Sequence, residues 1–172
     1  MEVRSEVHLR AGIVLREIRR EDLDALFVLD QVCFRPGIAY SRTELRYFLL
    51  HPKSISLLAE ECSAGPESAR IAGFVIAGRV FHEGCPLGHI ITIDVDPALR
   101  GRGVGSMLME MAEHRLHEAG AASIRLEVAV DNVAAQKFYL RHGYKQTGRI
   151  RGFYMGTLDA LVMEKPLSAA KR

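Results

Sequence analysis

The clearest chemistry in this sequence lies in a short glycine-rich segment from Arg100 to Gly105. Glycine occupies every second position there, at residues 101, 103 and 105, and Arg102 adds a second cation to that of Arg100. This spacing lets the backbone turn tightly and expose its N–H groups, and the amphipathic residues that follow predict a helix whose N-terminus favours negative charge. The segment therefore predicts a binding site for a pyrophosphate group.

Two better-known phosphate-binding loops do not fit this segment. The P-loop pattern G-x-x-x-x-G-K-[ST] is absent from the chain. The dinucleotide pattern G-x-G-x-x-G fails because Ser106 stands where the third glycine should follow Gly101 and Gly103. An acidic residue, Glu127, follows at a suitable distance, but it lies inside the next apolar-alternating run, whereas a ribose-binding acid lies at the end of a strand.

Two residues further along the chain, Glu127 and Tyr139, could move protons. Glu127 interrupts an alternating apolar run, on the face opposite to Leu126 and Val128, and Tyr139 lies in a short amphipathic segment. From spacing alone, a carboxylate on the solvated face of a strand and a packed aromatic on a helix explain these residues better than catalysis. A general base and a general acid are the alternative interpretation.

These motifs resemble those of a known family. The segment Arg100 to Gly105 is similar to the acetyl-CoA motif, Q/R-x-x-G-x-G/A, of the GNAT superfamily of N-acetyltransferases. Residues 126–139, LEVAVDNVAAQKFY, followed by Gly143 and Tyr144, resemble the ribosomal-protein-alanine branch of protein N-terminal α-acetyltransferases, whose pattern is L-E-V-x-x-x-N-x-x-A-x-x-x-Y…G-[FY]. The resemblance is specific over residues 93–144. In the first half of the chain it is limited to the order of the expected strands and helices.

The resemblance implies a role for each matching residue. Glu127 would be the general base, acting through water, and Tyr139 would be the general acid toward the CoA thiolate. Asn132 would contact the pantetheine or pyrophosphate region, and the Val95 N–H would face the thioester oxygen. The resemblance also implies which residues of the central strand and the glycine-rich loop bind acetyl-CoA. They are Ile93, Asp94, Val95, Arg100, Gly101, Arg102, Gly103, Val104, Gly105 and Ser106.

Aromatic residues in two loops are the candidates for contacting the acceptor amine. Phe34 and Tyr40 bound a loop between the first two predicted helices, and Tyr154 lies in a loop between the last two predicted strands. The resemblance implies that Tyr154 helps to hold a peptide N-terminus, whereas the residues alone also allow an exposed loop aromatic. The first loop departs from the family, because Arg35-Pro36-Gly37 stands where relatives often have a Pro-Trp pair.

A framework of strands and helices must position these residues. Alternating and helical hydrophobic spacing, together with caps and glycine or proline stops, predicts the order β-α-α-β-β-β-α-β-α-β-β. The expected elements cover residues 13–19, 21–34, 41–50, 54–61, 71–80, 89–95, 104–119, 123–130, 132–142, 144–151 and 157–165. Hairpins followed by one crossover predict an α/β protein with a mixed, mostly antiparallel sheet. The resemblance implies a GNAT-like fold with a splayed central parallel pair that admits the pantetheine arm.

The chain is expected to form one globular domain. Its 172 residues are 48% hydrophobic, which is enough for a sizeable core. We expect an N-terminal arm at residues 1–12, an N-acetyltransferase domain at residues 13–167 and a C-terminal tail at residues 168–172. The polar stretch 63–68 is expected to join two strands as a hairpin loop.

Composition argues against several other functions. The net charge of only +2 is too small for a protein that binds nucleic acids through electrostatic attraction. The apolar runs are too short to span a membrane. The three cysteines, Cys33, Cys62 and Cys85, form no C-x-x-C motif, and none of the seven histidines pairs at metal-ligand spacing. We therefore expect free thiols in the reducing cytoplasm and no metal.

The resulting hypothesis is an acetyl-CoA-dependent acyltransferase that acetylates a primary amine by direct attack in a ternary complex. The preferred acceptor is the α-amine of a protein or peptide N-terminus, and the protein is a monomer or homodimer. Arginines at positions 35, 42, 149 and 151, with little acid in the candidate loops, disfavour polycationic acceptors. A small-molecule amine is the alternative acceptor, and a catalytically silent CoA-binding module is the alternative function.

Overall fold

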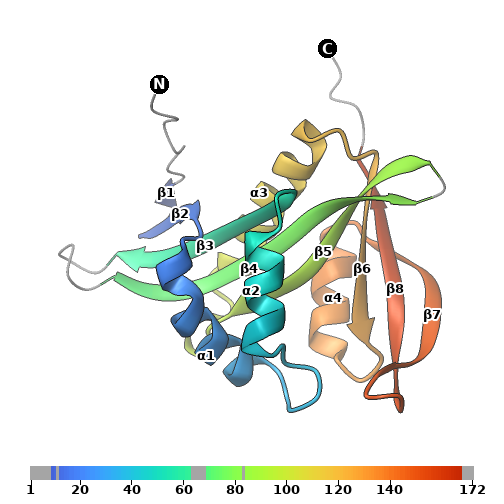
Figure 1. Ribbon diagram of the computed structural model, residues 1–172, viewed down its shortest axis with the longest axis horizontal. Coiled ribbons are helices and arrows are strands. Elements are labelled where there is room, and N and C mark those ends of the chain that lie inside the picture. Colours follow the sequence, from blue (N-terminus) through green and yellow to red (C-terminus); the bar gives the residue numbers. More distant parts are fainter. Residues whose placement is uncertain (1–8, 11, 63–68, 83, 168–172) are drawn as a thin grey trace. The chain divides into compact units, whose positions relative to one another are not determined.

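The computed structural model describes residues 9–10, 12–62, 69–82 and 84–167. The chain divides into two compact units (Figure 1): unit 1 comprises Met1–Ile76 and Thr92–Ala112, and unit 2 comprises Ala77–Ile91 and Glu113–Arg172. Each unit is therefore built from separate stretches of chain. The expected tail, the hairpin loop at 63–68 and most of the expected N-terminal arm lie outside the described residues.

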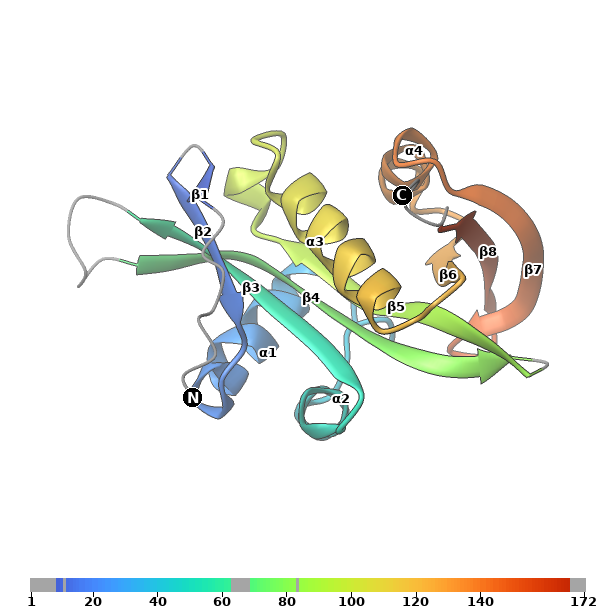
Figure 2. The same cartoon turned by 90° about the horizontal axis from the view of Figure 1, so that it is seen from above.

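Unit 1 combines antiparallel strands with two helices. Its elements are β1 (Leu9–Arg10), β2 (Ile13–Glu17), the 3-10 turn η1 (Arg20–Asp22), α1 (Leu23–Cys33), α2 (Arg42–Leu50), β3 (Ser54–Cys62) and the first part of β4 (Ala69–His82). Later in the chain come the end of β5 (Cys85–Val95), the 3-10 turn η3 (Pro97–Leu99) and the first part of α3 (Val104–Glu118). Figure 2 shows α1 and α2 on one face of the strands and the first part of α3 on the other. Leu26, Leu45 and Phe74 are fully buried in the resulting core.

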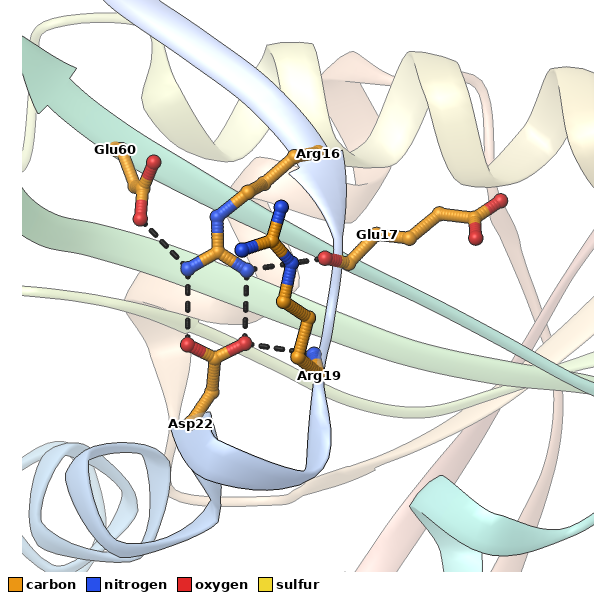
Figure 3. A network of polar contacts seen from close by, with 5 residues as sticks. All are labelled: Arg16, Glu17, Arg19, Asp22 and Glu60. Carbon is orange, nitrogen blue, oxygen red and sulfur yellow. Dashed lines mark hydrogen bonds and ion pairs between the residues drawn. The ribbon is translucent and has the colours of Figure 1, made fainter. Parts of the chain in front are cut away.

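Two local devices fix the helices of unit 1. A capping box starts α2 as the sequence indicates: the Glu44 N–H donates to the Ser41 hydroxyl (3.3 Å), and the Ser41 N–H donates to the Glu44 carboxylate (2.8 Å). An ion-pair network precedes α1 (Figure 3), in which Arg16 binds both carboxylate oxygens of Asp22 at 2.8 Å and Glu60 at 2.6 Å. These three side chains are mostly buried, so solvent screens their attraction less than at an open surface.

Unit 2 holds the remaining strands. They are the end of β4, the first part of β5, β6 (Ser123–Ala129), β7 (Lys145–Tyr154) and β8 (Leu158–Pro166). The unit also contains the end of α3 and the helix α4 (Val133–Arg141), which lies between β6 and β7 in the chain. The strand β8 pairs antiparallel with both β6 and β7. Figure 1 shows β7 and β8 as a long hairpin. Leu116, Ile124, Leu126 and Tyr144 are almost completely buried in this unit.

The predicted order of strands and helices is confirmed. Hydrogen bonds link the strands in the order β1-β2-β3-β4-β5-β6-β8-β7, which is a mixed sheet with β1 as a two-residue addition to the seven expected strands. The parallel pair joins Leu87–His89 of β5 to Ser123–Arg125 of β6. Among the described residues the pairing of these two strands ends there, whereas β6 stays paired with β8 as far as Ala129. This short pairing agrees with the expected splayed pair.

Only two strand boundaries differ from the prediction by more than two residues, and glycines explain both. The strand β5 begins at Cys85 rather than at His89, because Gly88 does not mark a turn: a Cβ atom there would lie 2.9 Å from Leu116 and 3.1 Å from Ile124. Gly88 therefore permits close packing within the strand. The strand β7 extends to Tyr154 through a register shift, and the turn itself is closed by Gly152 and Gly156, both with positive φ.

Candidate functional site

The carboxyl end of β5 forms the first part of the candidate site, in unit 1. Thr92 and Asp94 are buried, whereas Ile93 and Val95 alternate with them and are half-buried. The carbonyl oxygen of Val95 accepts hydrogen bonds from the Cys33 thiol (3.4 Å) and from Nε of Arg100 (3.2 Å). The strand end expected to pair with pantetheine is thereby fixed to the end of α1 and to the first arginine of the loop.

Gly73 on β4 allows its neighbour β5 to approach closely at this point. A Cβ atom at position 73 would overlap the carbonyl oxygen of Asp94 and lie 3.3 Å from Cα of Val95. Both contacts are with backbone, which cannot rotate away as a side chain can. The strand spacing beside Asp94 and Val95 therefore requires glycine at position 73.

The glycine-rich loop has the backbone geometry of an anion cradle. Gly101 and Gly103 have φ angles of 77° and 85°, which L side chains rarely adopt, and α3 begins directly afterwards at Val104. A Cβ atom built on either glycine meets no atom within 4 Å, so open space lies over the backbone there. An exposed turn that leads into the positive end of a helix dipole fits the pyrophosphate of acetyl-CoA.

The two arginines of this loop each contact a protein group. Nε of Arg100 donates to the carbonyl oxygen of Val95, and Arg102 forms an ion pair of 2.6 Å with Glu61. About half of the Arg102 side chain is exposed, so this ion pair is screened by solvent and contributes little to stability. Arg102 can therefore exchange Glu61 for a phosphate group at small cost.

The loop after α1 carries Phe34 and Tyr40, two of the aromatic residues expected near the acceptor. Main-chain contacts fix Tyr40 on both sides: its N–H donates to Oδ2 of Asp30 (2.8 Å), and its carbonyl oxygen accepts from Nε2 of Gln31 (2.9 Å). The Tyr40 ring packs edge-on against Phe48 with the ring centroids 5.3 Å apart. Helix α1 therefore anchors the loop through its last turns.

In unit 2, Glu127 lies on β6 with two basic partners. Nε2 of His89 is 2.6 Å from one carboxylate oxygen, Nε of Arg125 is 3.0 Å from the other, and only 12% of the Glu127 side chain is exposed. Burial alone raises the pKa of Glu127, but the hydrogen bonds and positive charge of His89 and Arg125 outweigh it and lower the pKa below its ordinary value. A carboxylate held in this way is a weak base that is well suited to orient an imidazole.

Tyr154 lies close to the same residue. Its hydroxyl donates to the backbone carbonyl oxygen of Glu127 at 3.4 Å, and its ring packs edge-on against Phe153. Burial, with the negative charge of Glu127 adding to it, raises the pKa of Tyr154 to about 12. The structure thus brings together two of the predicted site residues, and Tyr154 remains a neutral hydrogen-bond donor at physiological pH.

The helix α4 contributes Asn132 and Tyr139. Oδ1 of Asn132 caps the helix by accepting the Ala135 N–H at 3.1 Å, which leaves the amide nitrogen as a donor. Tyr139 is only 8% exposed, and its ring packs edge-on against Phe138 and Tyr144. Asn132 therefore caps the helix, and Tyr139 has the packing role that spacing alone favours for it, in addition to any role toward acetyl-CoA.

The predicted site residues are divided between the two units. Unit 1 holds the strand end, the glycine-rich loop, Phe34 and Tyr40, and unit 2 holds Glu127, Asn132, Tyr139 and Tyr154. The sequence assigned no role to His89 or Arg125. Arg125 could have been found, because residues two apart on a strand share one face. His89 could not, since it reaches Glu127 only through the register that pairs it with Arg125.

The described residues were compared with the requirements of a metal site and of a membrane-spanning helix. Within the described ranges, no three His, Cys, Asp or Glu side chains lie close enough together to hold a metal ion. No helix in the same part of the chain is both long and apolar enough to cross a bilayer. Cys33 and Cys85 are free thiols, and the side chain of Cys62 lies outside the described part.

Comparison with known proteins gives consistent matches. Residues 23–144 match the acetyltransferase (GNAT) family. N-alpha-acetyltransferase 30 of Schizosaccharomyces pombe is 31% identical over 70% of this chain and 77% of that protein, and aminoalkylphosphonate N-acetyltransferase of Salmonella typhimurium is 30% identical over 77% and 85%. The crystal structure of the ribosomal-protein-S18-alanine N-acetyltransferase from Escherichia coli superposes with a TM-score of 0.75 at 23% identity, covering 93% of this chain and 97% of that one. The structural likeness supports the fold.

Proposed function

Because this chain belongs to the acetyltransferase (GNAT) family and is an acetyl-CoA-dependent N-acetyltransferase, we propose that its acceptor is the α-amine of a protein or peptide N-terminus. The observation that carries this proposal is the half-buried cluster in which His89 and Arg125 bind Glu127. A proton acceptor that works near neutral pH suits an α-amine, with a pKa of about 7.7–8, far better than a lysine side chain near 10.4. The similarity to an N-alpha-acetyltransferase of Schizosaccharomyces pombe supports the same acceptor.

Acetyl-CoA supplies the acetyl group as an activated thioester. We assign its pyrophosphate to the loop of Arg100–Ser106 and its pantetheine arm to the backbone of Ile93–Val95, with Asn132 as a further contact. The open space over Gly101 and Gly103 supports the first assignment. The Val95 N–H is the proposed donor to the acetyl carbonyl oxygen, which gains negative charge as the amine attacks.

The pair of His89 and Glu127 is the proposed proton acceptor for the attacking amine. When Nε2–H of a neutral His89 donates to Glu127, the lone pair on Nδ1 is the basic atom of the ring. Glu127 then holds the tautomer and stabilises the imidazolium that forms as the proton is taken, while Arg125 keeps Glu127 ionised. We therefore assign the proton-accepting atom to His89 rather than to Glu127 acting alone through water.

Tyr139 is the proposed proton donor to the departing thiolate. A phenol is ordinarily protonated at neutral pH, as a general acid must be at the start of the reaction. The Tyr139 ring is held between Phe138 and Tyr144, so its hydroxyl has few alternative positions. Tyr154, Phe34 and Tyr40 are the proposed contacts for the first residues of the acceptor peptide.

A small-molecule amine is the second candidate acceptor. The similarity to aminoalkylphosphonate N-acetyltransferase favours it. Two of the arginines that disfavour polycations are less available than the sequence indicates, because Arg42 pairs with Asp24 and Arg149 pairs with Asp159. The charge argument against a cationic amine is therefore weaker than expected, and family membership sets aside the catalytically silent module.

A panel of acceptors tests this proposal. The purified protein is incubated with acetyl-CoA and, separately, a peptide with a free N-terminus, the same peptide with a blocked N-terminus and a free lysine, an aminoalkylphosphonate and a polyamine. We expect thiol release with the first peptide, with the acetyl group located on the α-amine by mass spectrometry. Faster release with the aminoalkylphosphonate would assign the small-molecule function instead. We propose that the reaction takes place in the cytoplasm, on a monomer or homodimer, in keeping with the free thiols of Cys33 and Cys85.

A further inference from the structure

We propose that Asp30 and Asp94 form a carboxyl pair that shares one proton and thereby positions the acceptor loop, Phe34–Tyr40, against the strand end Ile93–Val95. The consequence for catalysis rests on the proposed function, but the pair itself is defined by contacts within unit 1. Asp30 lies on α1 and Asp94 on β5, and neither is expected to touch the reacting atoms.

Both carboxyl groups are withdrawn from solvent. The exposed fraction is 0% for Asp30 and 1% for Asp94. Oδ1 of Asp94 accepts the Thr92 hydroxyl at 2.6 Å, and Oδ2 of Asp30 accepts the Tyr40 N–H at 2.8 Å. The two remaining oxygens, Oδ1 of Asp30 and Oδ2 of Asp94, are buried and accept no hydrogen bond from any described donor. The two carboxyl groups lie near enough to each other to interact electrostatically.

This arrangement requires a proton on one of the two groups. Two ionised carboxylates cannot hydrogen-bond, because neither has a hydrogen to donate, and two buried negative charges in contact would be strongly unfavourable. Burial raises the pKa of Asp30 to about 6 and that of Asp94 well above its ordinary range. Near neutral pH the pair therefore carries one proton and one negative charge, and it titrates as a unit.

The surrounding charges are consistent with a single negative charge at the pair. Glu44 on α2 adds negative charge near Asp30 and disfavours a second ionisation. Arg100 adds positive charge near Asp94 and helps to hold the one charge that remains. The Cys33 thiol donates to the carbonyl oxygen of Val95, and burial raises the pKa of this thiol to about 11, so it adds no charge at neutral pH.

The pair connects two segments of the proposed active site. Asp30 and Gln31 hold both backbone groups of Tyr40, at the end of the acceptor loop. Asp94 is the middle residue of the β5 segment Ile93–Val95, whose backbone is assigned to pantetheine. A shared proton therefore joins the loop that would receive the amine to the strand that would hold the thioester, and loss of this proton would push the two segments apart.

The first test measures stability against pH and needs no activity. In the unfolded chain both aspartates ionise near pH 3.9, so the wild-type protein takes up a proton on folding at neutral pH and loses stability as the pH rises. Asp94→Asn supplies a permanent donor to Asp30 and needs no proton. Relative to this variant, we expect the wild-type unfolding constant to increase by up to about tenfold per pH unit between about pH 5 and 7.

The control for this measurement is Asp24→Asn, which changes an exposed aspartate on the same helix. Its stability relative to wild type should not vary with pH over this range. A difference between wild type and Asp94→Asn that is also independent of pH would overturn the shared proton.

The second test measures the loop. Asp30→Ala removes the acceptor of the Tyr40 N–H, whereas Asp30→Asn keeps an acceptor oxygen and adds a donor toward Asp94. We expect amide hydrogen exchange in residues 34–40 to accelerate about tenfold or more in the alanine variant and to stay near wild type in the asparagine variant. The KM for the acceptor should rise about tenfold in Asp30→Ala, with the Kd for acetyl-CoA nearly unchanged, and Asp30→Asn should restore it.

The two tests separate the pair from the proposed function. Unchanged exchange and unchanged acceptor KM in Asp30→Ala would overturn the positioning role. If the wild-type protein acetylates no amine, the proposed function fails, and the stability and exchange measurements alone decide whether the pair exists and holds the loop.

Discussion

Nε2 of His89 lies 2.6 Å from Oε2 of Glu127, although the two residues are separated by 38 positions in the chain. The contact depends on the short parallel pairing that sets His89 beside Arg125, two residues before Glu127. Because the carboxylate also binds Arg125 and has a lowered pKa, it remains charged and directs the ring nitrogen of His89. This geometry supports the two tasks that we propose: His89 takes up the proton, and Glu127 orients the ring of His89.

Replacement of His89 tests this division of tasks. The amide side chain introduced by His89→Gln can still donate a hydrogen bond to Glu127 but cannot take up a proton. We expect kcat to fall by about 10²- to 10⁴-fold, the usual range for the loss of a general base, with the Kd for acetyl-CoA unchanged in calorimetry. The deficit should be greatest below about pH 7.5, where most of the amine is protonated, and should shrink above about pH 8.5, where the amine is already neutral.

A second histidine provides the matched control. His114 also contacts a glutamate, Glu118, at 3.4 Å, but on an exposed face of α3. His114→Gln should retain the wild-type rate and pH profile. Equal rates for His89→Gln and wild type would return the proton-accepting role to Glu127.

The open space over Gly103 predicts how the loop responds to a side chain. In Gly103→Glu, a carboxylate would occupy the region proposed for phosphate, so we expect the Kd for acetyl-CoA to rise by at least about a hundredfold. Gly84→Glu is the control, because Gly84 also has a positive φ and no atom within 4 Å of a built Cβ, and the backbone strain is therefore comparable. Calorimetry on both variants separates strain from occupancy, and equal affinities would contradict the cofactor assignment.

Gly73 predicts a loss of stability for a purely steric reason. The Cβ atom in Gly73→Ala would overlap the carbonyl oxygen of Asp94, so β4 and β5 must shift. We expect the free energy of unfolding to fall by about 1–3 kcal/mol, as in other overpacked sites. Gly148→Ala should change it by less than about 0.5 kcal/mol, since its nearest contact, with Val162, is an ordinary 3.6 Å. Denaturant unfolding of both variants measures the difference, and equal stabilities would show that the strands adjust freely.

The difference between Gly73 and Gly103 shows what the sequence could predict. Gly103 belongs to a local pattern of glycine, arginine and helix start, and such local patterns can be recognised directly in the sequence. The capping box at Ser41 and Glu44 was predictable for the same reason. Gly73 matters only because another strand passes beside it, and strand spacing is not visible in the sequence.

The same limit applies to the proposed site. Glu127 and Tyr139 could be selected from the motif that contains them, but the partners of Glu127 depend on strand register. The spacing of the apolar residues predicts only that Asp30 lies in an amphipathic helix. Its contacts with Asp94 and Tyr40 appear only when α1 packs beside β5. Motifs predicted the candidate residues, and packing determined the groups that surround them.

Tyr139 can be tested separately from its packing. Tyr139→Phe keeps the ring between Phe138 and Tyr144 and removes only the hydroxyl. If the phenol protonates the thiolate, kcat should fall by about ten- to ten-thousand-fold, with little change in the Kd for acetyl-CoA. Tyr144→Phe, at the neighbouring buried ring, should lower the melting temperature but leave kcat unchanged. A wild-type kcat in Tyr139→Phe would leave that residue with a packing role only.

The proposed preference for an α-amine follows from proton equilibria. At pH 7 about a tenth of α-amines are neutral, against fewer than about one lysine in a thousand. The α-amine therefore needs far less help from a base than a lysine side chain does. On a peptide with one free α-amine and one lysine, we expect mass spectrometry to find the acetyl group on the N-terminus, with the lysine modified far more slowly.

Glu127→Gln should reveal the same preference through pH. The amide keeps a hydrogen-bond acceptor for His89 but loses the charge that stabilises the imidazolium, so the deficit should be greatest below about pH 7.5 and shrink above about pH 8.5, where the amine is already neutral. Unfolding does not affect the comparison in this pH range. Because the pKa of Glu127 is lowered in the folded state, its ion pairs stabilise the protein at every pH above the pKa of the unfolded group, about 4.3. That stabilisation is lost only as the pH falls below this value. A deficit that persists at high pH, or lysine as the dominant product, would contradict an α-amine acceptor.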